Sequence, residues 1–296
     1  MSIRIVEVGP RDGLQNEKTP ISTADKLYFI RRLAKAGLKD IEATSFVSPK
    51  WVPQLGDAAE LWPQLPSGPD FSALVPNAKG LERAIEVGVQ RIALFTAASD
   101  AFTQKNINMT VAESLEAFRV VVDTFRDQVP DGWIRGYVST AFECPYSGRV
   151  EGTQVLRVCK ELLAMGVDEL SIGDTIGAAV PAEVGILTET LLHEVPIDMF
   201  AYHFHDTRGT AIANVAEALE HDIAIFDSSA GGLGGCPYAP GAGGNLATDD
   251  LVYFLERNGI RTGIDPVALA QSTLPVLALL GRAPAAKAQL AVLARC

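Results

Sequence analysis

Short apolar runs alternate along the chain with longer stretches in which apolar residues recur every three to four positions. The short runs are rich in β-branched and aromatic residues and therefore predict strands, whereas the longer periodic stretches predict helices. Eight strands are expected, at residues 3–8, 40–45, 71–75, 91–95, 134–139, 169–172, 200–204 and 224–227. Helices are expected between them, for example at residues 111–125, 153–165, 182–194 and 211–221.

The first helix is also marked by signals at both ends. Ser22 or Thr23 suits the N-cap, because a side-chain oxygen there satisfies a free backbone amide. Ala36 is the expected last residue, and Gly37 follows it where many helices end in a left-handed conformation.

The alternation of strands and helices predicts an α/β fold with a parallel sheet, and a count of eight strands favours a closed (β/α)8 barrel. A doubly wound open sheet is the alternative. The glycine-rich phosphate fingerprint expected after the first strand of such a sheet is absent, since the chain there reads GPRDG.

Three further helical stretches follow Asn245, at residues 249–257, 266–279 and 285–294. They are interpreted as the eighth barrel helix and additional C-terminal helices. No linker or low-complexity segment divides the chain. We therefore expect one domain over residues 1–296, with the last ~40 residues forming helices packed on the barrel.

Composition narrows the class of protein. The chain has 296 residues, of which 48% are hydrophobic, so it can form one large core. The net charge is −11 and the basic residues are scattered, which argues against a nucleic-acid partner. No apolar run reaches the ~20 residues of a membrane span, and strand-like sequence begins at Ile3 without a signal-peptide pattern, so a cytoplasmic protein is predicted. The four cysteines form no Cys-x-x-Cys pair and are expected to be reduced.

In a barrel of this kind, chemistry lies where strands end and loops begin. Arg11 and Asp12 follow the first strand, although Asp-Gly is also ordinary turn sequence. Glu42 and Ser45 end the second strand, where Glu42 alone is equally consistent with a solvated carboxylate. Asp174 follows the sixth strand and has two interpretations of equal weight, as a partner of a metal ligand or as a cap on the next helix.

A histidine pair ends the seventh strand. Because side chains alternate along a strand, His203 and His205 point to the same face. Two imidazoles on one face can chelate a metal ion, which we favour over two satisfied core histidines. Oxygen and nitrogen ligands suit Mg²⁺ or Mn²⁺ as well as Zn²⁺.

Residues 228–245 read SSAGGLGGCPYAPGAGGN, with more glycine than a short loop needs. This composition favours a lid that closes over a substrate, and a flexible surface loop is the alternative. Cys236 lies in the most glycine-rich part and is a candidate proton donor.

These motifs resemble those of hydroxymethylglutaryl-CoA lyase, one of the metal-dependent TIM-barrel lyases that are related to Claisen-type synthases. The resemblance covers nearly the whole chain. It is carried by VEVGPRDGLQNE at 6–17, TSFVSPKWVPQ at 44–54, KNIN at 105–108, GDTIG at 173–177, GLGGCPY at 232–238 and GNLAT at 244–248.

The resemblance implies a retro-Claisen lyase that cleaves 3-hydroxy-3-methylglutaryl-CoA or a related thioester with the help of a divalent cation. The implied metal ligands are Asp12, His203, His205 and Asn245, with Asp12 expected on the opposite side of the barrel from the histidines. Arg11 would stabilise the enolate oxygen, Glu42 would support Arg11, and Cys236 would take part in proton transfer. Contacts to the substrate are expected from Gln15, Ser45, Tyr137, Ser171 and Thr175.

The chain departs from the family pattern at several positions. Some members carry tyrosine in place of Arg208 and glycine in place of Glu143. Some have Asn and Lys contacting CoA where this chain has Gly281 and Ala283. We therefore expect either that CoA is held differently, for example through Arg282, or that the thioester partner varies. A preference of the acyl pocket for a longer branched hydroxyglutaryl-CoA is a further expectation.

The main rival function is a Claisen synthase of the isopropylmalate or homocitrate type, and the glycine-rich loop with Cys236 favours the lyase. A non-catalytic metal-binding relic has no support, because every proposed ligand and Arg11 are present. The expected partner is a small acyl-CoA, without nucleic acid or membrane, and the expected state is a homo-oligomer, a dimer or higher.

Overall fold

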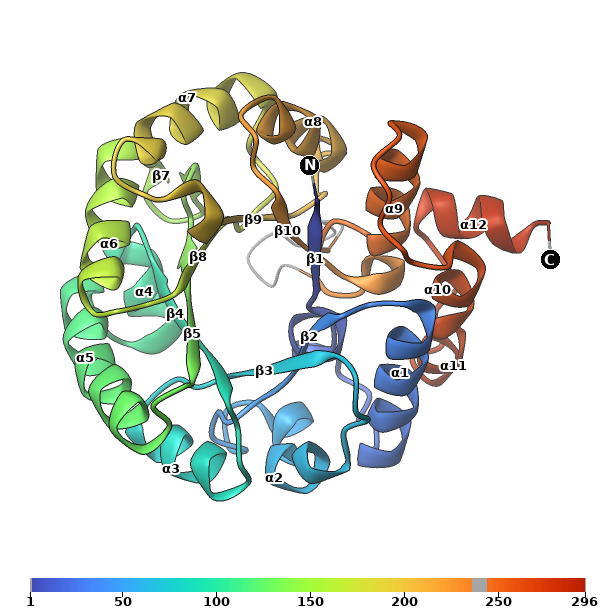
Figure 1. Ribbon diagram of the computed structural model, residues 1–296, viewed down its shortest axis with the longest axis horizontal. Coiled ribbons are helices and arrows are strands. Elements are labelled where there is room, and N and C mark those ends of the chain that lie inside the picture. Colours follow the sequence, from blue (N-terminus) through green and yellow to red (C-terminus); the bar gives the residue numbers. More distant parts are fainter. Residues whose placement is uncertain (1, 236–243, 296) are drawn as a thin grey trace.

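The structure is a computed structural model that describes residues 2–235 and 244–295. Its centre is a closed barrel of parallel strands in the order β1-β10-β9-β8-β5-β4-β3-β2 (Figure 1). The barrel strands are β1 (Arg4–Glu7), β2 (Asp40–Ser45), β3 (Asp70–Leu74), β4 (Arg91–Ala97), β5 (Trp133–Ser139), β8 (Glu169–Asp174), β9 (Phe200–Phe204) and β10 (Ile225–Ser228). Each predicted strand overlaps one of these, and the predicted (β/α)8 barrel is confirmed.

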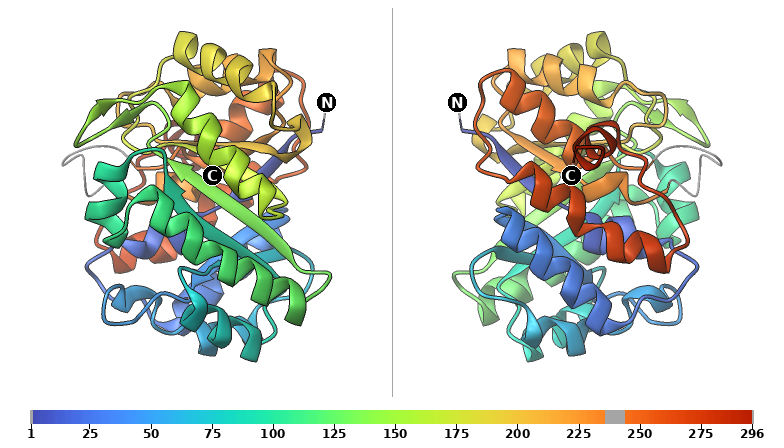
Figure 2. Two further views of the ribbon diagram at one scale, coloured as in Figure 1. Left: turned by 90° about the vertical axis from the view of Figure 1, so that its left-hand side faces the viewer. Right: turned by 90° about the vertical axis from the view of Figure 1, so that its right-hand side faces the viewer.

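Helices cover the outside of the barrel (Figures 1 and 2). They are α1 (Thr23–Ala36), α2 (Ala58–Leu61), α3 (Ala78–Glu86), α4 (Asp100–Ile107), α5 (Val111–Gln128), α6 (Gly152–Ala164), α7 (Pro181–Leu192), α8 (Ala211–Glu220), α9 (Thr248–Arg257), α10 (Pro266–Ser272), α11 (Leu274–Leu279) and α12 (Lys287–Leu293). A short hairpin of β6 (Glu143–Cys144) and β7 (Gly148–Arg149) follows β5.

Helix α1 begins and ends where its sequence signals predict. The Ser22 side chain accepts a hydrogen bond from the backbone amide of Asp25 at 3.2 Å. Gly37 has a φ of 106°, and a Cβ at this position would lie only 2.6 Å from the carbonyl oxygen of Gly263. Glycine is therefore required both by the backbone conformation and by the close approach of the chain that leads into α10.

The expectation of one helix over residues 266–279 was wrong, because α10 and α11 are separate and meet at Thr273. Pro275 has no amide to donate to the carbonyl of Gln271, four residues earlier. That carbonyl instead accepts a hydrogen bond from Arg32 Nη2 at 3.0 Å. The interruption therefore joins the C-terminal helices to α1, beside which α10 lies in Figures 1 and 2.

The two faces of β9 illustrate how the barrel is filled. Phe200, Tyr202 and Phe204 point outward into the large apolar layer beneath the helices. Ala201 belongs to a small apolar cluster inside the barrel, and His203 follows on the same side. The strand alternation predicted from the sequence thus brings the histidines to the interior.

Glu7 points to the outer side of β1 and is fully buried. Its carboxylate accepts hydrogen bonds from the amides of Gly9 at 2.8 Å and Ala230 at 2.9 Å, and from Thr248 Oγ1 at 2.7 Å. One side chain therefore connects the turn after β1 with the segment after β10. Burial raises the pKa of Glu7 to about 7, despite the three donors.

We expect this carboxyl to make stability depend on pH. Between the unfolded pKa of 4.5 and about 7, the folded protein retains a proton that the unfolded chain has lost, so stability falls as the pH rises through this window. Glu7→Gln is expected to abolish this pH-dependent change, which amounts to roughly 3 kcal/mol in the free energy of unfolding. Urea unfolding at several pH values across the window measures it. Glu116→Gln, at an exposed position, is the control. Parallel curves for wild type and Glu7→Gln would contradict the assignment.

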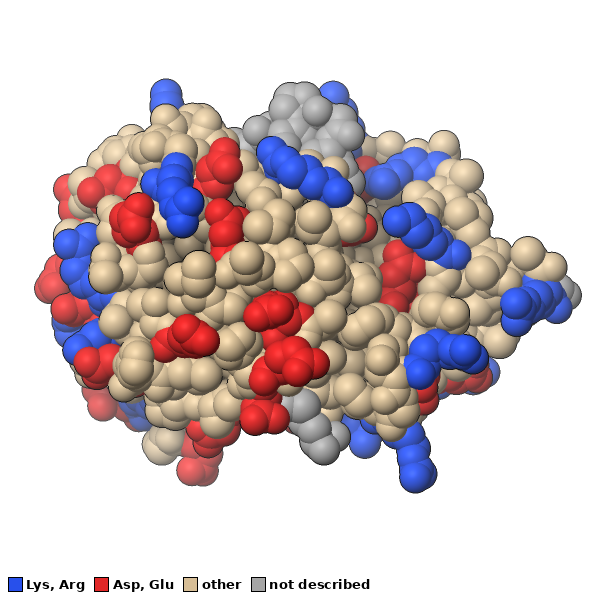
Figure 3. All heavy atoms as spheres, turned by 90° about the horizontal axis from the view of Figure 1, so that it is seen from above, with Lys and Arg blue, Asp and Glu red and all other residues tan. Residues whose placement is uncertain are grey.

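No helix within residues 2–235 and 244–295 combines the length and the apolar character that a membrane span requires. On the face seen in Figure 3, basic and acidic side chains are interspersed. This face accordingly lacks the extended basic surface that binds nucleic acid.

Candidate metal centre and active site

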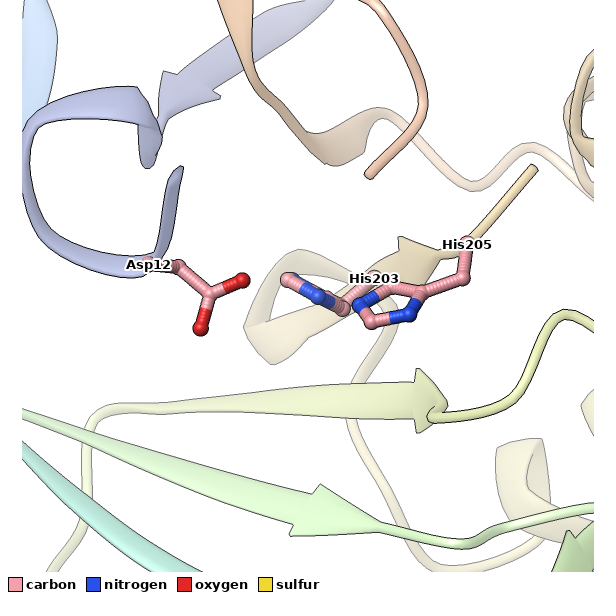
Figure 4. Close-up of side chains that lie close together, drawn as sticks. All are labelled: Asp12, His203 and His205. Atoms are coloured by element: carbon pink, nitrogen blue, oxygen red, sulfur yellow. The ribbon is translucent and has the colours of Figure 1, made fainter. Parts of the chain in front are cut away.

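Asp12, His203 and His205 meet at the end of the barrel where the strands finish. Each offers one ligand atom, and these atoms lie within 4.8 Å of one another (Figure 4). Asp12 comes from a helical turn over Gly9–Gly13, in which the amides of three residues share the carbonyl of Val8. The strand order corrects one expectation, since only β10 separates β1 from β9 and Asp12 is not on the opposite side of the barrel.

The two imidazoles are held differently. His203 Nδ1 lies 3.0 Å from Asp227 Oδ2, which fixes the ring and leaves Nε2 for a ligand. His205 is buried, and its Nδ1 has no hydrogen-bond partner among the described residues. Burial and the nearby His203 lower the pKa of His205 to about 4, so its imidazole is neutral near pH 7, which is the form that binds metal ions.

Asn245 joins the cluster from the segment that precedes α9. Its Nδ2 donates to Asp12 Oδ2 at 2.8 Å and to the carbonyl of Leu233 at 3.2 Å. Its backbone forms a bridge with His205. Burial alone would raise the pKa of Asp12, but the Arg11 guanidinium and the two imidazoles outweigh it and lower the pKa to about 2. Asp12 is therefore ionised near pH 7, which is the form that binds a cation.

These residues fit a divalent cation. His205 Nδ1 and Asn245 Oδ1 are both buried and unpartnered within the described chain, which is costly unless a further group satisfies them. One carboxylate, two imidazoles and one amide oxygen form a mixed oxygen and nitrogen donor set. The predicted ligands are thus brought together, while the choice of metal stays a prediction.

Arg11 lies beside the cluster and is buried. Its Nη1 donates to Asp12 Oδ1 at 2.6 Å, and its Nε donates to Glu42 Oε1. Glu42 Oε2 accepts a second hydrogen bond from Tyr137 Oη. The guanidinium is therefore fixed by two carboxylates, one of which belongs to the metal cluster.

Two charged residues of this centre escaped the sequence analysis, Asp227 on β10 and Arg135 on β5. Asp227 Oδ2 also accepts from Ser171 Oγ at 2.8 Å, and its Oδ1 accepts from Arg135 Nη2 at 2.6 Å. The signal available in the sequence is a single charged residue in each of two strands, which marks both residues as candidates but does not pair them.

Other predicted side chains bond to the protein itself. Ser45 Oγ lies 3.2 Å from the carbonyl of Leu74, and Thr175 Oγ1 accepts the amide of Thr140 at 2.7 Å. Gln15 lines a hollow of about 550 Å³ beside Trp51. Contacts of Gln15, Ser45, Tyr137, Ser171 and Thr175 with substrate remain predictions.

Asp174 uses its two carboxylate oxygens to accept the amides of Ala178 at 2.9 Å and Ala179 at 3.0 Å. These amides belong to the turn that precedes α7, whose N-cap is Val180, so Asp174 braces this turn and does not cap the helix. Burial raises its pKa to about 6. A supporting role of Asp174 toward a metal ligand stays a prediction.

The predicted proton donor, Cys236, lies outside the described residues.

The departures from the family pattern have local partners. Arg208 Nη1 donates to the carbonyls of Ile176 at 2.8 Å and Gly177 at 2.9 Å, which ties the loops after β8 and β9 together. Arg282 is paired with Glu17 at 2.5 Å. Arg282 must leave this partner, or share it, in order to hold CoA.

The chain is similar to curated lyases over its full length. It is 48% identical over 295 residues, 99% of this chain and 98% of the relative, to the 3-hydroxy-3-isohexenylglutaryl-CoA/hydroxy-methylglutaryl-CoA lyase of Pseudomonas aeruginosa. It is 47% identical over 296 residues to the hydroxymethylglutaryl-CoA lyase of Pseudomonas mevalonii, covering 99% of this chain and 98% of that protein.

Solved structures of lyases with the same names have the same fold as this chain. A hydroxymethylglutaryl-CoA lyase from Pseudomonas aeruginosa has a TM-score of 0.96 and 47% identity, covering 100% of this chain and 98% of that one. An HMG-CoA lyase from Acinetobacter baumannii in complex with coenzyme A and 3-methylmalate has a TM-score of 0.91 and 36% identity, covering 97% and 93%. The HMGL-like family model matches residues 2–274, a span that contains the whole barrel and every residue of the candidate metal site, so the chain belongs to the HMGL-like family.

Proposed function

We propose that the protein is a divalent-cation-dependent carbon–carbon lyase that cleaves 3-hydroxy-3-methylglutaryl-CoA, or a related 3-hydroxy-3-alkylglutaryl-CoA, to acetyl-CoA and a keto acid. The observation that carries this proposal is the cluster of Asp12, His203 and His205 at the barrel mouth, with Arg11 held directly beside it. The chain is 47–48% identical, over nearly its full length, to enzymes that are named as lyases of these thioesters, and this similarity supports the same reaction.

Asp12, His203, His205 and Asn245 are the residues that would hold the cation. When bound, the cation supplies a Lewis acid that lowers the pKa of the tertiary hydroxyl of the substrate. Arg11 bonds to Asp12 and therefore lies directly beside the residues that would hold the cation.

Cleavage transfers the hydroxyl proton to a base, for which Asp12 and His203 are the proposed residues, and turns the carbinol C–O into the carbonyl of the keto acid. The bond between the carbinol carbon and the methylene next to the thioester breaks, and its electron pair remains as a thioester enolate. Arg11 is suited to donate to the enolate oxygen, where charge appears only as the bond breaks. Its Nε and Nη1 are fixed by Glu42 and Asp12, so the guanidinium is oriented before the reaction. Protonation of the enolate carbon then gives acetyl-CoA.

We assign this last proton to Cys236. Cys236→Ala is expected to bind metal and substrate nearly as the wild type does and to turn over about 10²- to 10⁴-fold more slowly, as measured by single-turnover kinetics. Thiol alkylation is expected to inactivate the enzyme, with protection by bound substrate.

Cys144→Ala and Cys159→Ala are the controls, since both cysteines are buried. Burial raises the pKa of the Cys159 thiol to about 12, so this thiol stays protonated and unreactive toward alkylating reagents. Retention of most of the wild-type kcat by Cys236→Ala would remove the thiol from the mechanism and leave a lid role for the loop.

A panel of 3-hydroxy-3-alkylglutaryl-CoA thioesters tests the reaction itself. We expect release of acetyl-CoA in the presence of Mg²⁺ or Mn²⁺, and the relative kcat/KM values identify the preferred acyl chain. A Claisen synthase would instead release free CoA thiol from acetyl-CoA and a 2-keto acid. Thiol release with that pair, and no cleavage of any thioester in the panel, would overturn the lyase assignment.

The remaining proposals concern the molecule as a whole. We propose Mg²⁺ or Mn²⁺ as the metal on the basis of the donor set. We also propose an acyl-CoA as the partner, which the relative solved with coenzyme A and 3-methylmalate supports. A homo-oligomer and a cytoplasmic location are also proposed; among the similar proteins some are bacterial and others are named mitochondrial.

A further inference from the structure

A fully buried guanidinium lies inside the barrel below the metal cluster, and no step described above uses it. Arg135 on β5 is only 1% exposed. It has three polar neighbours: Asp227 Oδ1 at 2.6 Å, Glu169 Oε1 at 2.8 Å and Tyr137 Oη at 3.3 Å. Because a buried charge is costly unless it is paired, these contacts define where the guanidinium must stay.

The first contact leads to the metal cluster. Arg135 holds one oxygen of Asp227, while the other oxygen faces His203 Nδ1 at 3.0 Å and Ser171 Oγ at 2.8 Å. A carboxylate that accepts from Nδ1–H selects the tautomer in which Nε2 carries the free lone pair. The orientation and tautomer of His203 therefore depend on an aspartate whose own position is set by Arg135.

The second contact leads to Arg11. Tyr137 donates its hydroxyl proton to Glu42, so its oxygen accepts from Arg135 Nη1. Glu42 in turn accepts from Arg11 Nε. The two guanidinium carbons lie 5.2 Å and 5.3 Å from the centroid of the Tyr137 ring, so this ring contacts both cations.

We propose that Arg135 is a positioning residue of the lyase, which orients both the histidine that would hold the metal and the arginine that would stabilise the enolate. The inference rests on the proposed function. The third contact is an ion pair between Arg135 Nε and Glu169 Oε1 that lacks hydrogen-bond geometry. It holds the guanidinium at the opposite end by charge, where Glu169 also pairs with Arg4. Anchored in this way, Arg135 presents its Nη groups toward Asp227 and Tyr137.

The test is Arg135→Lys, which retains the charge but cannot reach three partners with one ammonium group. We expect the affinity of the metal-free protein for Mn²⁺, measured by electron paramagnetic resonance, to fall about 10- to 100-fold. We expect kcat at saturating Mn²⁺ to fall as well, with KM for the thioester nearly unchanged. In ¹⁵N spectra of the imidazoles, His203 should lose its preference for the Nδ1–H tautomer.

Arg126→Lys is the matched control. Arg126 pairs with Asp168 at 2.7 Å on the outside of the barrel and contacts no residue of the centre. It should change the urea midpoint at most, and leave Mn²⁺ affinity, kcat and the His203 tautomer unaltered. If Arg135→Lys behaves in the same way, Arg135 is structural only and the proposal is overturned.

Asp227→Asn provides a second variant should Arg135→Lys fail to fold. It keeps the shape of the side chain and removes the carboxylate through which Arg135 acts on His203. An Mn²⁺ affinity within twofold of wild type would overturn the proposal. Mn²⁺ affinity and the tautomer are measured without turnover, so both readouts hold even if the thioester panel disproves the lyase reaction.

Discussion

Arg11→Lys is expected to lower kcat by about 10³-fold while leaving KM for the thioester nearly unchanged. Glu42 and Asp12 accept hydrogen bonds from Arg11 Nε and Nη1, respectively. Because the guanidinium is planar, these two bonds also fix the direction of its remaining N–H groups. A lysine ammonium keeps the charge but cannot bond to both carboxylates and to a substrate oxygen in the same geometry. The loss should therefore fall on the transition state, in which charge develops on the thioester oxygen, and steady-state kinetics at saturating metal measure it.

The control for this variant is Arg119→Lys. Arg119 pairs with Glu161 at 2.6 Å on the helical surface, where the side chain is 43% exposed. An exposed pair contributes little to stability and has no contact with the barrel mouth, so kcat should stay at the wild-type value. An Arg11→Lys enzyme within a few-fold of wild type would exclude a role for Arg11 in stabilising the enolate. A large rise in KM with constant kcat would instead indicate a binding role.

The sequence predicts the barrel and its histidine pair well because both depend on local alternation. His203 and His205 share a face through the two-residue repeat of one strand, which no distant part of the chain has to specify. The turn that carries Asp12 was placed at the correct strand end, but its position relative to β9 depends on which strands neighbour each other. In a closed (β/α)8 barrel only the eighth strand separates the first from the seventh, so the predicted fold already implied that Asp12 lies near the histidines.

The centre below the histidines could not be predicted in this way. Arg135 and Asp227 are 92 positions apart in the chain, and each is the single charged residue of its strand. A single charged residue in such a strand is consistent with an edge position, an exposed face or a buried pair. Only the closed barrel brings the two charges to 2.6 Å of each other and makes the buried pair the stable arrangement.

Asp12→Asn is expected to lower the affinity for Mn²⁺ by more than about 100-fold, because it removes the carboxylate from a donor set that otherwise consists of neutral groups. The substituted amide keeps the size of the side chain but loses the charge that offsets a dication. In the wild type, Asn245 Nδ2 donates to Asp12 Oδ2 at 2.8 Å. An asparagine at position 12 can place its own NH₂ group there, and two donors would then face each other. Titration of the metal-free protein with Mn²⁺, followed by electron paramagnetic resonance, measures this affinity without turnover.

Asp206→Asn is the matched control, since Asp206 directly follows His205 but uses its Oδ1 to accept the amide of Ala211 at 3.0 Å. An asparagine oxygen can accept the same hydrogen bond, so the start of α8 should be preserved. We expect Asp206→Asn to bind Mn²⁺ as wild type does. Equal affinities for Asp12→Asn and wild type would show that the cation is held elsewhere. If both variants lost Mn²⁺ affinity to the same extent, the cause would be the total negative charge at the barrel mouth. A specific ligand role for Asp12 predicts a loss in Asp12→Asn alone.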